Sequence, residues 1–185
     1  MKLIPVLKAH SWRPNEENIL REKLLNMDLS PWIAYAIDEG SALRYLSFSG
    51  NINKEQELDE AKKIALENLA GFGTEMQKQH IDGENIIMVT GSECTCEKIL
   101  DKTFLDWLHF ELRNEKIIIG IPFRGFLCAV SDKGNLKYKM PKLIKKYFQD
   151  TSMERISENI FLSVKGKVVA MAGVESNTDG SPENY

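Results

Sequence analysis

The feature that most constrains the fold is a pair of β-type runs joined by a very short link. Residues 116–122 (KIIIGIP) and 125–132 (GFLCAVSD) are apolar and rich in β-branched residues, and only Phe123 and Arg124 separate them. A parallel pair would need a crossover of a dozen or more residues, so these strands must pair antiparallel. The chain is therefore expected to build antiparallel sheet.

Two further hairpins follow the same logic. Residues 32–38 and 43–48 flank one short run of turn-forming residues, and residues 160–164 and 168–172 flank another. One more apolar run, residues 86–90, follows an Asp-Gly turn signal. These segments together predict about seven strands, most of them antiparallel.

Four segments have the spacing of apolar residues that is typical of helices. The first is expected over residues 15–27, the second between a cap at Asn53 and a stop at Gly71, the third over residues 95–113, and the fourth from Pro141 onward. The predicted fold class is therefore α+β, a mostly antiparallel sheet of about seven strands packed by about four helices.

Length and composition indicate one domain. A chain of 185 residues is the size of one ordinary domain. We expect residues 1–173 to form a single α+β domain and residues 174–185 to form a flexible C-terminal tail, because that tail is polar and lacks apolar spacing. The oligomeric state stays open.

Charge and hydropathy disfavour two classes of partner. The formal charge of −3 and the pI of about 5.7 argue against specific nucleic-acid binding, which needs uncompensated Lys and Arg. No run approaches the roughly 18 apolar residues of a membrane span, and the apolar run at residues 3–7 is too short for a signal peptide. We therefore expect a cytoplasmic protein with no membrane partner.

The cysteine pattern predicts neither a disulfide framework nor a metal site. Cys94, Cys96 and Cys128 are few and odd in number, so we expect reduced thiols. Zinc needs about four ligands, and the other obvious candidates, His80 and His109, do not fall in a recognised spacing. No metal and no other cofactor is predicted.

Five strings spread over nearly the whole chain carry a family resemblance. They are LIPVLK (3–8), IAYAIDEG (33–40), AKKIALENL (61–69), IIIGIPFRGFLCAVSDKG (117–134) and ISENIF (156–161). Through them the chain resembles the YtpQ-like family of bacterial proteins of unknown function. The resemblance implies a single-domain cytoplasmic protein and brings no catalytic residue. This chain has Gly125 where the family usually carries an acidic residue.

Three residues are the candidates for a binding site. Arg124 lies in the tight turn, where it is expected to be exposed or to bond loop carbonyls, and Asp38 ends a strand at a turn. Trp32, together with Trp12, lies near a strand end or loop, where a tryptophan can anchor a partner or simply pack in the core. A cluster of lysines before and on the fourth predicted helix is expected to be a solvated helix face.

Two functions from different classes remain. The first is a non-catalytic binding or accessory module that engages another protein, favoured because no phosphate loop, nucleophile elbow or paired-histidine motif is present. The alternative is an enzyme of unknown reaction that uses Cys94 or Cys96, or a histidine with a carboxylate, in a pocket. Surface shape should discriminate them, because catalysis needs a concave site with convergent titratable groups.

Overall fold

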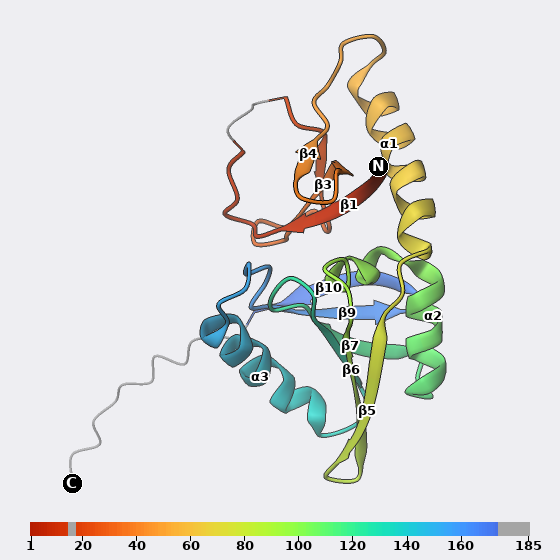
Figure 1. The fold of residues 1–185 in the computed structure, drawn as a ribbon. Coiled ribbons are helices and arrows are strands. Elements are labelled where there is room, and N and C mark those ends of the chain that lie inside the picture. The colour runs from red at the N-terminus through yellow and green to blue at the C-terminus, as the bar shows by residue number, and fades with distance from the viewer. Residues whose placement is uncertain (15–17, 174–185) are drawn as a thin grey trace, which may run out of the picture.

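The computed structural model describes residues 1–14 and 18–173, and it has the α+β class that the sequence predicts. Within these residues, ten strands form two antiparallel sheets, and there are three α-helices. The prediction of one sheet of about seven strands packed by about four helices is wrong in the number of sheets, strands and helices. Figure 1 shows the two sheets one above the other, joined by the descending helix α1.

The N-terminal sheet has the strand order β1-β3-β2, and β4 pairs with β3 beside β2. Its strands are β1 (Lys2–Lys8), β2 (Arg21–Lys23), β3 (Trp32–Asp38) and β4 (Leu43–Tyr45). Helix α1 (Lys54–Ala70) begins where the Asn53 side chain accepts a hydrogen bond from the backbone N–H of Gln56, as the sequence predicts. It lies along this sheet and buries Ala61, Ala65 and Leu69.

The C-terminal sheet has the strand order β10-β9-β7-β8-β6-β5, with every pair antiparallel. Its strands are β5 (Glu75–Ile81), β6 (Glu84–Thr90), β7 (Lys116–Gly120), β8 (Leu127–Ser131), β9 (Ile160–Val164) and β10 (Lys167–Ala172). The predicted hairpins β7–β8 and β9–β10 are confirmed, as is the β3–β4 hairpin in the other sheet.

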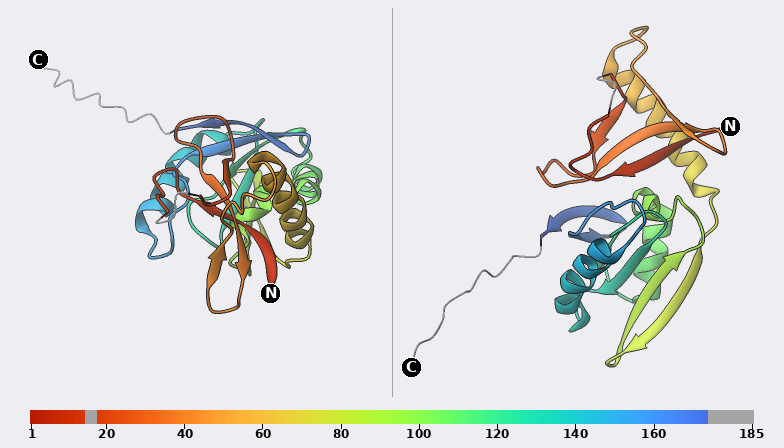
Figure 2. Two further views of the ribbon diagram at one scale, coloured as in Figure 1. Left: turned by 90° about the horizontal axis from the view of Figure 1, so that it is seen from above. Right: turned by 60° about the vertical axis from the view of Figure 1, so that its left-hand side comes forward.

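Two helices cover opposite faces of this second sheet. Alternate residues of a strand face opposite sides, so Ile117 and Ile119 pack with α2 (Lys102–Glu111), whereas Ile118 packs with α3 (Leu136–Asp150). Figure 2 shows α2 and α3 on the two sides of the sheet. The largest core cluster also includes Leu7 and Tyr35 of the N-terminal sheet, so apolar packing is continuous between the sheets.

The predicted helix over residues 15–27 is wrong. Residues 15–17 lie outside the described residues, Ile19 forms an isolated bridge with Ser47, and residues 21–23 form β2. The apolar residues flanking β2 have helical spacing, but β2 itself has none, and its pairing with β3 makes it a strand.

Three other elements, strand β5 and two helices, differ from the sequence prediction. Strand β5 is missed because all seven residues are exposed, so it lacks any apolar pattern. The helix expected over residues 95–113 is broken at Asp101, which ends a 3-10 helix, η1 (Cys96–Leu100), and caps α2. Helix α3 begins before Pro141, and the predicted tail, residues 174–185, lies outside the described residues.

Candidate functional site

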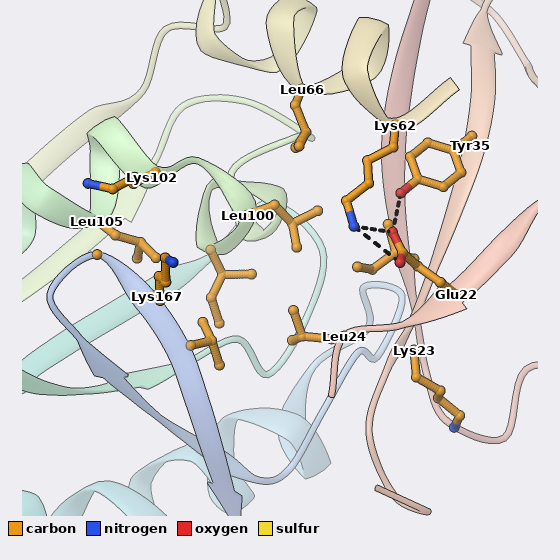
Figure 3. A pocket seen from close by; sticks show the side chains of 14 residues that line it. Glu22, Lys23, Leu24, Tyr35, Lys62, Leu66, Leu100, Lys102, Leu105 and Lys167 are labelled. Atoms are coloured by element: carbon orange, nitrogen blue, oxygen red, sulfur yellow. Dashed lines mark hydrogen bonds and ion pairs between the residues drawn. The ribbon is translucent and has the colours of Figure 1, made fainter. Parts of the chain in front are cut away.

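A cleft lies between the two sheets. Its volume is about 610 Å³, and strands β2 and β3, helices α1, η1 and α2, and the β9–β10 turn line it. Figure 3 shows side chains from both halves of the molecule facing this space. A cavity of this size falls in the range of ligand sites, which is roughly 300–1,000 Å³.

One end of the cleft is polar and connected by hydrogen bonds. The Tyr35 hydroxyl donates to Glu22 Oε1 at 2.6 Å, and Lys62 Nζ lies 2.9 Å from the same oxygen. Burial and the Glu22 bond raise the pKa of Tyr35 well above its ordinary value. This phenol therefore stays protonated and serves as a donor, so it cannot act as a base.

The remaining walls are apolar with a basic rim. The apolar side chains come from both halves and include Leu24, Leu66, Ile99, Leu100, Leu105 and Val168. Among the charged lining residues, the four lysines Lys23, Lys62, Lys102 and Lys167 outnumber the single carboxylate of Glu22. Lys102 also pairs with Asp106 at 2.5 Å on the exposed face of α2. The cleft thus suits an apolar ligand that carries negative charge.

Two free sheet edges border this cleft. Strand β2 is the outer strand of the N-terminal sheet and β10 is the outer strand of the C-terminal sheet, and within residues 1–14 and 18–173 neither has a second strand neighbour. Glu22 of β2 and Val168 of β10 both line the cleft. An edge strand presents unpaired backbone N–H and C=O groups on its outer side.

The cysteines that could have served as nucleophiles lie elsewhere. All three are buried free thiols, as the sequence predicts, and Cys96 donates to Glu97 Oε2 at 3.0 Å. Burial raises the pKa of Cys94 and of Cys128 to about 12, and it raises that of Cys96 well above its ordinary value. Thiols in this state are poor nucleophiles, because the thiolate is the reactive form.

The histidines do not supply a base beside these thiols. His109 is buried, and its two ring nitrogens bond the carbonyl oxygen of Asn114 at 2.8 Å and the hydroxyl of Ser163 at 2.9 Å. His80 lies on exposed strand β5 and His10 lies on an exposed turn. Within the described residues, no group of three or more His, Cys, Asp and Glu side chains could hold a metal ion.

Arg124, which the sequence predicts either to be exposed or to bond backbone carbonyls, is largely buried, with a side-chain exposure of 12%. Its guanidinium donates to Glu97 Oε1 at 3.0 Å, to Glu154 Oε2 at 2.7 Å and to the backbone oxygen of Leu7 at 2.9 Å. Glu97 is fully buried and also accepts from the Leu7 N–H at 2.9 Å. Arg124 therefore joins β1 of one sheet to the β7–β8 turn of the other.

The other two sequence candidates lie at opposite ends of β3. Asp38 Oδ1 accepts from the Gly40 N–H at 2.8 Å, which is a turn bond of the kind expected for an aspartate there. Trp32 begins the strand, and its indole N–H donates to the carbonyl oxygen of His10 at 3.2 Å. Arg124, Asp38 and Trp32 therefore do not converge on one site. Among the predicted lysine cluster, Lys139 pairs with Asp82.

Sequence reasoning missed the residues that define the cleft. Glu22 lies in a segment predicted to be helical, and Tyr35 and Lys62 lie in segments assigned only to packing. In the sequence these three residues share only a polar side chain beside an apolar run, and many residues without a binding role have the same pattern. The hydrogen bonds of Glu22 reach residues 13 and 40 positions away, a relation that a single sequence does not display.

Comparison with known proteins adds no relative: no family model, no curated protein and no solved structure matches this chain. Across the described residues, no helix is both long enough and apolar enough to cross a membrane. The function of this chain is therefore inferred from the geometry of its own residues.

Proposed function

We propose that this protein is a non-catalytic binding module whose cleft accepts an extended segment of a partner protein. The observation that carries this proposal is the position of the cleft between two free sheet edges, β2 and β10. A peptide in extended conformation can pair with such an edge through its backbone, while pockets beside the edge select its side chains.

The chemistry of the cleft defines the segment that fits. Apolar walls favour apolar side chains, which bury area without requiring hydrogen bonds. Lys167 at the rim forms no ion pair within the described residues, whereas Lys62 pairs with Glu22, so Lys167 favours Asp or Glu at a neighbouring position of the segment. Because side chains of a strand alternate between two sides, the expected ligand alternates apolar and acidic residues.

The competing proposal is an enzyme that uses Cys94, Cys96 or a histidine. The burial and raised pKa values of the cysteines disfavour it, as do the structural bonds of His109. No cysteine, serine or histidine is among the described residues that line the cleft. A bacterial and cytoplasmic setting remains part of the proposal on the strength of the sequence.

Peptide selection with a matched pair of variants tests the proposal. Random nine-residue peptides are displayed on phage and selected on the wild-type protein, and the enriched peptides are titrated by fluorescence anisotropy. Val168 lines the cleft, whereas its neighbour Val169 is 52% exposed and does not line it. We expect Val168→Arg to weaken binding at least about tenfold and Val169→Arg to leave it unchanged.

Hydrogen exchange locates the bound peptide independently of the variants. Strand addition should slow the exchange of outward-facing amides in β2 and β10 and leave those in β5 unaffected. Equal binding by Val168→Arg and Val169→Arg would exclude the cleft as the site. A substrate screen in which turnover is abolished by Cys96→Ala would establish the enzyme instead.

A further inference from the structure

A second feature, which shares only Lys23 with the cleft, is a cluster of cations and tryptophans at one end of the N-terminal sheet. Arg21 and Lys23 lie two residues apart on β2, and Lys23 is directly opposite Trp32 in the register with β3. The Arg21 guanidinium and the Lys23 ammonium each lie 4.2 Å from the centre of the Trp32 ring. The same guanidinium lies 5.5 Å from the Trp12 ring.

The positive charges of this cluster are not neutralised by the described carboxylates. Neither Arg13, Arg21 nor Lys23 forms a salt bridge to a carboxylate in the described residues. Lys23 donates to the backbone oxygens of Asp28 and Ser30, and Arg13 donates to backbone oxygens as well. Bonds to neutral carbonyls satisfy donors but leave the charge in place.

Arg21 has an unused donor. Its Nη1 is buried and has no hydrogen-bond partner among the described residues. An arginine carries five N–H donors in a planar fork, and a buried donor without a partner is unfavourable. The arrangement is therefore incomplete until an acceptor arrives.

Repulsion among Arg13, Arg21 and Lys23 indicates that a ligand here would be negatively charged. Burial and the nearby charge of Arg13 lower the pKa of Arg21, and burial together with Arg13 and Arg21 lowers that of Lys23, although the Asp28 charge opposes this shift. Like charges held close together destabilise a fold. A bound anion would offset this repulsion.

The surface is hollowed on both sides of Arg13. One hollow of about 410 Å³ is lined by Trp12 and Tyr45, and a second of about 330 Å³ is lined by Lys23, Trp32 and Asp28, with Arg13 common to both. Arg21 lines neither hollow, but its guanidinium lies near the Trp12 ring of the first and the Trp32 ring of the second. The first offers aromatic rings to a flat group and the second offers cations to an anion. Hollows of this size suit a small molecule more than a long polymer.

We infer that this surface binds the phosphate group of a small organic molecule, with Arg13 and Lys23 as the direct cationic partners and Arg21 adding positive charge beside them. Arginine matches phosphate because its fork donates two parallel hydrogen bonds to two phosphate oxygens. The molecule's ring or other flat part would lie against Trp12 and Tyr45. This site shares only Lys23 with the peptide cleft, so it is independent of the proposed function.

The test uses the full chain with four defined probes: inorganic phosphate, pyrophosphate, adenosine monophosphate and adenosine. Binding is followed by calorimetry and by the fluorescence of the tryptophans, two of which lie in the site. We expect the three phosphates to bind and the uncharged nucleoside not to bind. Binding should weaken as salt is added, because screening reduces attraction between exposed charges.

Matched variants assign the binding to this cluster. Arg13→Gln and Arg21→Gln should each weaken phosphate binding at least about tenfold, and Arg21→Lys should retain most of it. Arg155→Gln is the control, because Arg155 also lies 5.5 Å from an aromatic ring, that of Phe148, but outside the cluster. Arg13 lies in an outer loop, so its variant stays informative even if Arg21→Gln fails to fold.

Three results would overturn the inference. The first is the absence of saturable phosphate binding below about 10 mM, and the second is equal affinity in wild type, Arg13→Gln and Arg21→Gln. The third is a thymidine oligonucleotide that binds more than about a hundredfold better than any mononucleotide, which would indicate a polymer site. Val168→Arg should leave phosphate binding intact, so failure of the peptide proposal is distinguishable from failure here.

Discussion

The contrast between two arginines shows how this molecule uses positive charge in two ways. Arg124 donates to two carboxylates and one backbone oxygen, and it joins the two sheets. Arg21 lies against two tryptophans, and its buried Nη1 has no partner among the described residues. A paired buried charge fixes the fold, whereas an unpaired one is available to a ligand.

Burial acts on the pKa of both Arg124 and Arg21, but the two pKa values shift in opposite directions. Burial lowers the pKa of any arginine, because it disfavours the charged form. At Arg124 burial is the largest single effect, but the charges of Glu97, Cys96 and Glu154 together with the Glu154 hydrogen bond outweigh it, and the pKa is raised above its ordinary value. At Arg21 the charge of Arg13 adds to the effect of burial, and the pKa is lowered. Removing each side chain should therefore have different effects on stability.

The largest effect is expected for Arg124→Ala. This change leaves Glu97 charged, fully buried and without its cation, and it leaves the Leu7 carbonyl without this donor. Breaking a buried ion pair by removing one partner typically costs about 3–5 kcal/mol in the free energy of unfolding. Urea unfolding followed by circular dichroism measures the loss.

A double-mutant cycle attributes this loss to the pair. In Glu97→Gln the buried carboxylate is neutralised, so adding Arg124→Ala should cost much less than it does alone. A loss below about 1 kcal/mol for Arg124→Ala in the wild-type background would show that the network contributes little.

A smaller loss is expected for Cys96→Ala. The Cys96 thiol is one of the donors to Glu97, and its removal takes away one hydrogen bond inside a packed core. We expect a loss of about 1–2 kcal/mol, measured by the same urea titration, with Cys96→Ser closer to wild type because it retains a donor. The native thiols should also resist a thiol reagent until the protein unfolds, and rapid modification of Cys96 in the native state would contradict its structural role.

Local features of the fold were predictable from sequence, and distant pairings were not. The hairpins were predicted because turn residues and flanking strands are neighbours in the chain, as in β7–β8. Strand β2 was missed because it consists of Arg, Glu and Lys, and the apolar residues on either side of it have helical spacing, so only its pairing with β3 identifies it. Strand β5 was missed because it is exposed on both faces, and only its register with β6 identifies it as a strand.

The same limit applies to the candidate sites. Arg124 was selected from its place in a tight turn, where a guanidinium can bond loop carbonyls, and in the structure it bonds the Leu7 carbonyl and two carboxylates. Its partner Glu97 was not found, since an acidic residue at a helix start has an ordinary electrostatic explanation. The Arg21 cluster was hidden because Arg13, Arg21 and Trp32 come together only when β2 pairs with β3.

An effect of lower magnitude is expected from the pH dependence of Glu154. Burial opposes its ionisation, but hydrogen bonds from Arg124 and Lys8 outweigh burial and lower the pKa below its ordinary value. A lowered folded-state pKa contributes stability above the unfolded value of about 4.3, and this stability is lost as pH falls through the folded value. Because the side chain is 40% exposed, solvent weakens the contribution.

Thermal unfolding at two pH values checks this prediction. Glu154→Gln should melt below wild type at about pH 6, and the two should converge at about pH 3, where the wild-type carboxyl is protonated. A gap that stays constant across this range would mean that the charge of Glu154 does not stabilise the fold.

The smallest effect on stability is expected for Arg21→Gln, and this result would sharpen the contrast most. The variant loses cation–π contacts with Trp12 and Trp32, each worth about 0.5–1 kcal/mol at an exposed site, but it also removes the repulsion from Arg13. These effects oppose each other, so the free energy of unfolding should change by no more than about 0.5 kcal/mol.

The informative comparison is between Arg21→Gln and Arg124→Ala, measured side by side for stability and for phosphate binding. We expect the first to keep its stability and lose phosphate, and the second to lose stability while any folded fraction still binds phosphate. If Arg21→Gln is as unstable as Arg124→Ala, then Arg21 has a structural partner that its geometry does not reveal. In that case the Trp12 and Trp32 rings would be a packing element of the N-terminal sheet, because the free donor is what distinguishes a ligand site from a buried cation.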